Sequence, residues 1–186
     1  MFYPILTALR DGMDDVSCNR LASDFIGYIN AVEAQQTIRM TNTFPSIDEY
    51  LRLRAGDIGV CAFITENEYA MSFALPQDVY SSPPMKDILR LAVELVVLAN
   101  DLLSLQKEVG DGQLDNIVTL LVAHQSLSLD QAVAEVIQMI RVDYARFLKA
   151  TRDLGVVDEK GTGVSRETWE YVLGVRASVV ANIMWR

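Results

Sequence analysis

The sequence predicts an all-α fold, and three observations support this prediction. Apolar side chains recur at helical spacing along most of the 186 residues, and strand-like alternation is absent over any useful length. The apolar segments end at clusters of Pro, Gly and Ser, which interrupt helices. Two segments begin with a capping box, in which a serine precedes a Glu or Gln by three residues. We therefore expect a helical bundle in a single domain that spans residues 1–186.

The first 41 residues contain a short apolar segment and a long helix. Residues 1–13 resemble the end of a longer element, and a helix is expected over about 16–40. Asp14 and Asp15 precede this helix, where carboxylates interact favourably with the helix dipole. The expected helix has one apolar stripe, formed by Leu21, Phe25, Tyr28, Ile29 and Val32.

Gly56 and Gly59 predict a break in the helix that begins at the capping box of Ser46. Each glycine in a helix interior costs roughly 1 kcal/mol relative to alanine, and such a cost often marks a kink or a close approach. Arg54 and Asp57 flank this weak point, either as a surface ion pair or as a guanidinium placed to bind an anion. Residues 65–82 are expected to form a short helix and a loop.

Four helical segments are expected in the second half, over residues 85–109, 116–124, 128–154 and 165–185. His124, the single histidine, has no partner at useful spacing and is interpreted as a surface or capping residue. The third segment should turn seven side chains inward: Val133, Val136, Ile137, Ile140, Tyr144, Phe147 and Leu148. The last segment carries its apolar positions at Trp169, Val172, Leu173, Val175, Val179, Val180 and Trp185.

Asn100, Ser104 and Glu108 are spaced i, i+4, i+8 and form a stripe of oxygen donors on one side of the central helix. An amide oxygen, a hydroxyl and a carboxylate suit a hard cation such as Mg²⁺. Lys107 lies close to the stripe, and a cation beside a metal site suggests an anionic ligand such as a phosphate. Alternatively, the stripe is the solvated side of an amphipathic helix. The apolar stretch 88–99 favours the first interpretation, because it predicts a buried helix that leads into the stripe.

Net charge and cysteine content exclude some classes of function. A net charge of −9 argues against nucleic acid as a partner, because phosphate backbones require basic patches. The two cysteines, Cys18 and Cys61, have no paired spacing and are expected to be reduced. Neither a signal peptide nor a membrane span is evident. We therefore expect a cytoplasmic protein.

The stretch N-D-L-L-S-L-Q-K-E at 100–108 resembles the second metal-binding motif of class I terpene synthases. This resemblance implies that Asn100, Ser104 and Glu108 hold one Mg²⁺. Arg54 stands 46 residues before Asn100 and ends the segment P-S-I-D-E-Y-L-R-L-R. This segment is similar to the one that carries the family's diphosphate-sensing arginine. By the same resemblance, Asp57 links this sensor to the helix break. The backbone carbonyl of the next residue, Ile58, then reaches towards the substrate.

Two further motifs of the family have no match in this chain. Asp14-Asp15 lies too close to Asn100 for the aspartate-rich first metal motif and lacks its third carboxylate. The Arg-Tyr pair expected beyond Trp185 is also missing, and Arg186 is out of register for it. The resemblance therefore implies an incomplete class I terpenoid synthase-like bundle that lacks N-terminal helices and the extreme C-terminus.

The family resemblance implies metal-dependent ionisation and cyclisation of a prenyl diphosphate, expected to be farnesyl diphosphate, to a sesquiterpene with release of diphosphate. Arg54 and Lys107 would bind the substrate, and a homodimer is one expected assembly. Turnover by so short a chain should be very weak. Candidate pocket-wall residues, any of which could instead be plain core, are Val93, Val96, Phe63 and Trp185.

The alternative function is a catalytically inactive helical fragment or binding module of the same fold. A chain-elongating prenyltransferase is disfavoured, because its second motif is rich in aspartate where this chain has Asn100 and Ser104.

Overall fold

The computed structural model describes residues 3–41, 45–155 and 163–184. Within these ranges all the elements are helices, which confirms the predicted all-α class. The helices are α1 (Tyr3–Gly12), α2 (Asp15–Thr41), α3 (Ile47–Asp57), α4 (Val60–Ala70), α5 (Gln77–Tyr80), α6 (Pro83–Gly110), α7 (Ile117–Gln125), α8 (Leu129–Leu154) and α9 (Arg166–Met184). None of these described helices is long and apolar enough to cross a lipid bilayer.

Side-chain caps fix where several helices begin. The Asp14 carboxylate accepts a hydrogen bond from the Ser17 amide at 2.7 Å, which confirms a capping role for Asp14 at α2. Ser82 caps α6, and Pro83 follows at the first helical position, where a missing N–H costs nothing. Both bonds of the predicted capping box at Ser128 are present at the start of α8.

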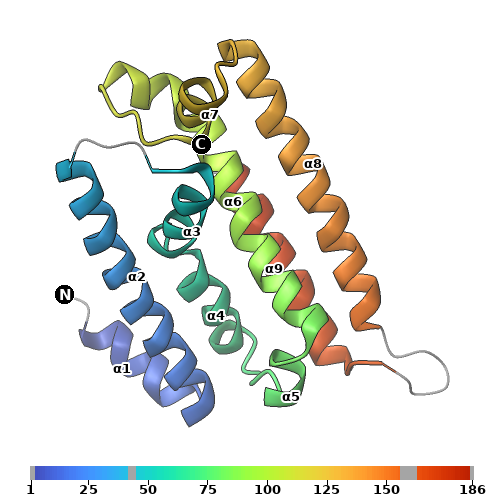
Figure 1. Cartoon of the computed structure of the whole chain (residues 1–186). Coiled ribbons are helices and arrows are strands. Elements are labelled where there is room, and N and C mark those ends of the chain that lie inside the picture. Colours follow the sequence, from blue (N-terminus) through green and yellow to red (C-terminus); the bar gives the residue numbers. More distant parts are fainter. Residues whose placement is uncertain (1–2, 42–44, 156–162, 185–186) are drawn as a thin grey trace.

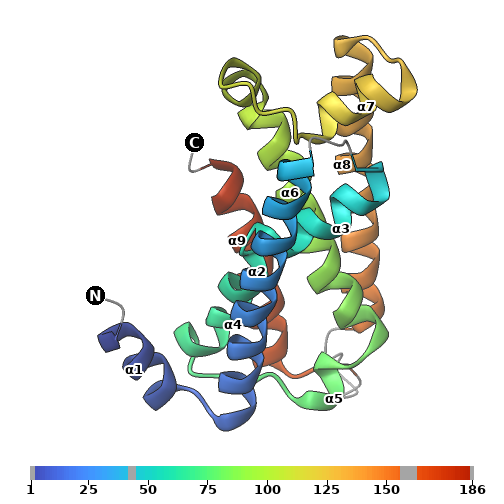
Figure 2. The ribbon, with the colours of Figure 1, turned by 60° about the vertical axis from the view of Figure 1, so that its left-hand side comes forward.

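α6 forms the centre of the bundle, as Figure 1 shows, and it packs against α3, α4, α8 and α9. Its middle is buried on nearly every side, as the composition of 88–99 predicted. One core cluster joins α6 to α4, α8 and α9, and a second joins its Leu98 to Tyr50 of α3, to α7 and to α8. Figure 2 shows α1 projecting from the opposite side of the molecule to α8.

The predicted helix break is confirmed between α3 and α4. α3 ends at Asp57, and Gly59 adopts a left-handed conformation with φ of 73°, which only glycine enters without strain. Gly56 has a different role, because a Cβ at this position would lie 2.6 Å from the Cβ of Ala31. The two glycines therefore mark a turn in the chain and a close contact between α2 and α3.

Polar contacts join α2 to α4 beneath this break. Arg20 forms a buried ion pair with Glu68 at 2.8 Å, and Ser17 donates a hydrogen bond to the same carboxylate. The guanidinium of Arg20 also lies 4.2 Å from the ring centroid of Tyr80. A buried ion pair holds its partners in place mainly because separating them would leave a charge unpaired in the core.

Several apolar side chains predicted to face the interior are exposed. The described neighbouring helices cover only part of each apolar stripe. On α2 only Leu21 of the five-residue stripe is buried. α8 and α9 each bury one side against α6, and the edges of their stripes remain exposed. The predictions of inward-facing side chains were wrong at Ile137 and Tyr144, and the apolar positions Leu173 and Val180 are exposed as well.

Candidate functional site

The oxygen stripe lies at the C-terminal end of α6 and is partly buried. Ser104 is 7% exposed, and Asn100 and Glu108 are half-buried. Lys107, in the last turn of the same helix, is exposed. The structure therefore does not place the stripe on a fully solvated helix face, which was the alternative interpretation.

The hydroxyl and carboxylate oxygens of the stripe retain the capacity to bind a cation. The Ser104 hydroxyl donates to the Asn100 backbone oxygen at 2.7 Å, so the lone pairs of its own oxygen stay available as acceptors. Glu108 Oε2 accepts one hydrogen bond from Asn116 at 2.8 Å, and a carboxylate has about four acceptor positions. An amide, a hydroxyl and a single carboxylate are hard oxygen ligands of the kind that Mg²⁺ prefers.

The described residues contain no group of three or more His, Cys, Asp or Glu side chains arranged to hold a metal. The stripe supplies one such residue, Glu108, together with two neutral oxygen donors. A cation held there would complete its coordination with water or with phosphate oxygens, as Mg²⁺ commonly does. These residues therefore suit a cation that shares its coordination shell with an anionic ligand.

Arg54 of α3 reaches the stripe directly. Its Nη2 donates to Asn100 Oδ1 at 3.2 Å, and its Nη1 donates to Asp57 Oδ1 at 2.9 Å. The Asp57 side chain is only 3% exposed, so this pair is not the surface ion pair that the sequence allowed. Burial opposes the charge of Arg54, but Asp57 and then Asp101 outweigh it and raise the pKa of the guanidinium.

Asp57 and Ile58 belong to the same turn as Arg54. The Ile58 amide donates to the Arg54 carbonyl oxygen at 3.2 Å and closes the last turn of α3. Gly59, in a left-handed conformation, then interrupts the helix before α4 begins. The three predicted residues are therefore held in one helical turn, immediately before the break and next to the end of α6.

A buried network beneath this contact was missed by sequence reasoning. Asp101 is fully buried and accepts hydrogen bonds from the Tyr50 hydroxyl and from the Ile117 amide, the latter at 3.0 Å. Arg54 Nε lies 3.5 Å from its other oxygen. Val97, four residues earlier on the same side of α6, is also buried. This spacing is a signal that could have identified Asp101 as an interior carboxylate.

Burial dominates the electrostatics of this network. It raises the pKa of Tyr50, and the neighbouring Asp101 carboxylate raises it further. Burial also raises the pKa of Asp101, although the bond from Tyr50 and the charge of Arg54 act in the opposite direction. Both side chains need their partners, because an unpaired polar group at this depth would be costly.

The candidate wall residues divide into two groups. Val93 and Val96 are buried in the core cluster around α6, which fits the plain-core interpretation. Phe63 is 54% exposed, and Trp185 lies outside the described residues. His124 is exposed and its Nε2 lies 2.8 Å from the Pro45 carbonyl oxygen, in keeping with a surface role.

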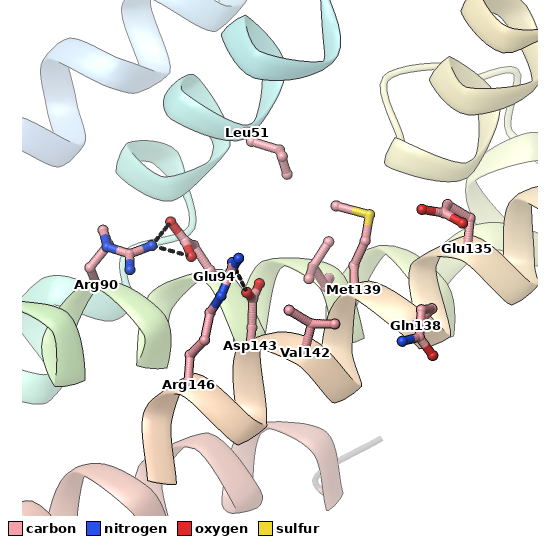
Figure 3. Close-up of a pocket in the computed structure, with 10 residues that line it drawn as sticks. Leu51, Arg90, Glu94, Glu135, Gln138, Met139, Val142, Asp143 and Arg146 are labelled. Atoms are coloured by element: carbon pink, nitrogen blue, oxygen red, sulfur yellow. Dashed lines mark hydrogen bonds and ion pairs between the residues drawn. The ribbon is translucent and has the colours of Figure 1, made fainter. Parts of the chain in front are cut away.

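A cavity of about 350 Å³ lies between α3, α6 and α8 (Figure 3). Each wall carries an ion pair within its own helix, Arg90 with Glu94 on α6 and Arg146 with Asp143 on α8. Leu98, which lines this cavity, and Asn100 differ by about 200° around the helix axis. The cavity and the stripe therefore lie on different sides of α6.

One known protein family matches most of the chain. The model of terpene synthase family 2, C-terminal metal binding, matches residues 1–146. This match contains the α3–α4 break and the whole stripe of α6.

Two curated fungal relatives agree with this description. The chain is 40% identical over 187 aligned residues to terpene cyclase braA of Annulohypoxylon truncatum, covering 100% of this chain and 49% of the relative. It is 31% identical over 160 residues to sesquiterpene cyclase hepA of Aspergillus oryzae, covering 85% of this chain and 43% of the relative. The chain thus spans about half the length of these curated relatives.

Solved structures share the arrangement of helices. Linalool/nerolidol synthase from Streptomyces clavuligerus, in complex with 2-fluorogeranyl diphosphate, superposes with a TM-score of 0.90 at 20% identity, over 99% of this chain and 63% of that one. A point variant of cucumene synthase gives a TM-score of 0.81 at 23% identity, over 98% of this chain and 60% of that one. At these identities the similarity concerns the fold.

Proposed function

The chain belongs to the terpene synthase family, and we propose that residues 1–186 form the C-terminal part of a catalytic domain that ionises and cyclises a prenyl diphosphate. The observation that carries this proposal is the hydrogen bond between Arg54 and Asn100. Two segments with different proposed roles, 46 residues apart, meet at one place in the fold. A diphosphate held there would contact a guanidinium from α3 and a cation held by α6.

Each residue of the site has a role suited to a diphosphate. Asn100, Ser104 and Glu108 would hold Mg²⁺, which when bound withdraws charge from the diphosphate oxygens and makes diphosphate a better leaving group. Arg54 donates hydrogen bonds to the anion, as a planar guanidinium does to phosphate oxygens. Asp57 fixes the orientation of Arg54 through the 2.9 Å ion pair.

Two further residues complete the proposed site. Lys107 adds an exposed positive charge near the stripe, where it can meet the same diphosphate. Ile58 places its backbone at the helix break, from which its carbonyl oxygen would reach the reacting end of the substrate.

We propose farnesyl diphosphate as the substrate and a sesquiterpene as the product. One relative at 31% identity is named a sesquiterpene cyclase, which supports this chain length. An allylic cation formed from such a substrate survives only where water is excluded, and the stripe begins where the buried apolar part of α6 ends.

A second candidate function is a binding module of the same fold without catalytic activity. The observation that favours it is coverage, because the chain spans about half of its curated relatives. Such a module would retain the stripe and Arg54 without a complete pocket around them.

Isothermal titration with Mg²⁺ and inorganic pyrophosphate tests the site. We expect the wild-type chain to bind pyrophosphate only in the presence of Mg²⁺, and both Arg54→Ala and Glu108→Gln to weaken this binding at least about tenfold. Arg90→Ala is the matched control, because Arg90 is half-exposed and lines the cavity on a different side of α6. Titrations that are identical in wild type and both site variants would contradict the proposal.

Release of diphosphate from farnesyl diphosphate distinguishes the two candidates further. Very weak Mg²⁺-dependent release that disappears in Glu108→Gln would support a partial catalytic domain. Pyrophosphate binding without any release would favour the binding module, and release at rates typical of enzymes would contradict the proposal that the domain is partial.

A further inference from the structure

We propose that Asn116 is a positioning residue for Glu108, an inference that rests on the proposed function of the stripe. Asn116 stands at the N-cap of α7 and is fully buried. Its Nδ2 donates to Glu108 Oε2 at 2.8 Å and to the Asp101 backbone oxygen at 2.7 Å. Its Oδ1 accepts from the Val118 amide at 2.9 Å. One side chain thus caps α7 and binds two points on α6.

Capping alone does not require an asparagine. Asn, Asp and Ser cap helices about equally well, because each supplies an oxygen to the amides of the first turn. Only the amide side chain also supplies two N–H donors. At this position both donors point to α6 rather than to α7, so the part of Asn116 that capping leaves unused is the part that contacts Glu108.

Glu108 needs a contact from outside its own helix. It lies in the last turn of α6, which ends at Gly110, and Gly112 with φ of 73° follows closely. Residues that follow α6 donate hydrogen bonds to the last carbonyl oxygens of this turn, including Gln113 N to Glu108 O at 2.8 Å, and these bonds fix the main chain but not the direction of the carboxylate. The bond from Asn116 connects this turn to a buried residue of the next helix.

A neutral donor suits a carboxylate that must also bind a cation. A lysine or arginine in the same place would fix the orientation of Glu108 but would cancel its charge. The Asn116 amide fixes one oxygen of Glu108 and leaves the full negative charge in place. Hydrogen bonds of this kind to metal-binding carboxylates commonly govern metal affinity.

The start of α7 also connects to the other half of the site. Asp101, whose backbone oxygen is bound by Asn116, accepts a hydrogen bond from the Ile117 amide and lies next to Arg54. Residues 116 and 117 therefore contact both the proposed metal ligand Glu108 and the carboxylate that borders the proposed diphosphate sensor.

Two substitutions that retain the cap separate positioning from capping. Asn116→Ser keeps an N-cap oxygen and removes the bond to Glu108, and Asn116→Asp keeps the cap and places a negative charge against Glu108. The apparent affinity for Mg²⁺ is measured calorimetrically at a fixed, saturating concentration of inorganic pyrophosphate. We expect a loss of about 10- to 100-fold for Asn116→Ser and at least as large a loss for Asn116→Asp.

Val136→Ala controls for a general loss of stability. Val136 is fully buried in the second core cluster, which joins Leu98 and Tyr50 to α7 and α8, and its side chain forms no hydrogen bond, so its truncation weakens packing without touching the stripe. Urea unfolding measures the free energy of unfolding of each variant, so that affinities are compared between variants of similar stability. Wild-type Mg²⁺ affinity in Val136→Ala, beside the loss in Asn116→Ser, supports the positioning role. An equal loss in Val136→Ala overturns it.

The remaining outcomes distinguish this inference from the proposed function. If both Asn116 variants bind Mg²⁺ as tightly as wild type while Glu108→Gln does not, the inference is overturned and the proposed function stands. If the wild-type chain shows no Mg²⁺-dependent pyrophosphate binding, both are overturned.

Discussion

At the scale of single residues, Tyr50 and Asp101 connect three helices. The Tyr50 hydroxyl of α3 donates to Asp101 of α6, which in turn accepts from the first amide of α7. Neither side chain is more than 3% exposed, so neither can replace a lost partner with bulk water. The hydrogen bond from this hydroxyl therefore contributes more to the free energy of unfolding than an average hydrogen bond, because its loss leaves a buried carboxylate short of a donor.

We expect Tyr50→Phe to lower the free energy of unfolding by about 1–3 kcal/mol, since it removes this donor and keeps the ring in the core. Urea denaturation followed by circular dichroism measures the change. Tyr28→Phe is the matched control, because Tyr28 is 38% exposed, and it should stay within about 0.5 kcal/mol of wild type. Equal stabilities of the two variants would contradict a structural role for the buried hydroxyl.

Local spacing explains which site residues could be predicted from the sequence. The stripe follows from the i, i+4, i+8 positions of Asn100, Ser104 and Glu108 on one helix. Arg54 followed from its place beside the two glycines and from family resemblance, and the structure adds its contact with Asn100. The role of Asn116 could not be predicted, because its bond to Glu108 depends on how α7 folds back against α6.

At the scale of elements, the α3–α4 break shows how two nearby glycines serve different purposes. Gly59 adopts a left-handed conformation. A Cβ added to it would lie 3.7 Å from the nearest side-chain atoms, so there is room for a larger residue. Gly56 has ordinary helical geometry but lies against Ala31 of α2. The sequence predicted the break from both glycines, whereas the structure assigns the turn to Gly59.

Alanine substitutions should separate these purposes. Gly59→Ala should destabilise the chain by about 1–2 kcal/mol through backbone strain. Gly56→Ala should cost about 1–3 kcal/mol through overpacking against Ala31. Gly27→Ala is the control, because a Cβ at this position in α2 meets nothing within 4 Å, and it should stabilise the helix by up to about 1 kcal/mol. Thermal unfolding measures all three, and a neutral Gly59→Ala would contradict the strain argument.

Helix ends were more predictable than helix faces. Caps are local, so Ser46 and Ser128 marked the starts of α3 and α8 within a residue. Burial depends on which surface a neighbouring helix covers, and periodicity does not report this. The apolar stripe of α2 illustrates the difference, because it has regular helical spacing yet Ile29 is 61% exposed.

At the scale of the whole molecule, the chain presents an apolar surface along α2. Phe25, Ile26 and Ile29 are 38%, 60% and 61% exposed. Contiguous apolar surface of this kind usually marks a place where other protein packs. The curated relatives are about twice as long, so they have additional chain that this surface could contact in their own folds.

We expect the isolated chain to bind an apolar fluorescent dye and to self-associate, with a homodimer as the simplest proposed product. The double variant Ile26→Lys, Ile29→Lys should reduce both effects, because it places two charges on the apolar surface, while the free energy of unfolding changes by about 0.5 kcal/mol or less. Dye fluorescence and sedimentation velocity measure these effects. Leu129→Lys, at an exposed position on α8, is the control, and a monodisperse wild-type monomer without dye binding would contradict the expectation.

The burial of α6 sets the order in which parts of the molecule open. The free energy of local opening rises with burial, so amide hydrogens between Ile88 and Leu98 should exchange with solvent last, and those of α1 early. Asn100 adjoins this slowly exchanging segment, whereas Glu108 lies beyond it in a terminal turn. The backbone at Asn100 should therefore open less often than the backbone at Glu108. Of the three residues of the stripe, Glu108 depends most on support from another helix.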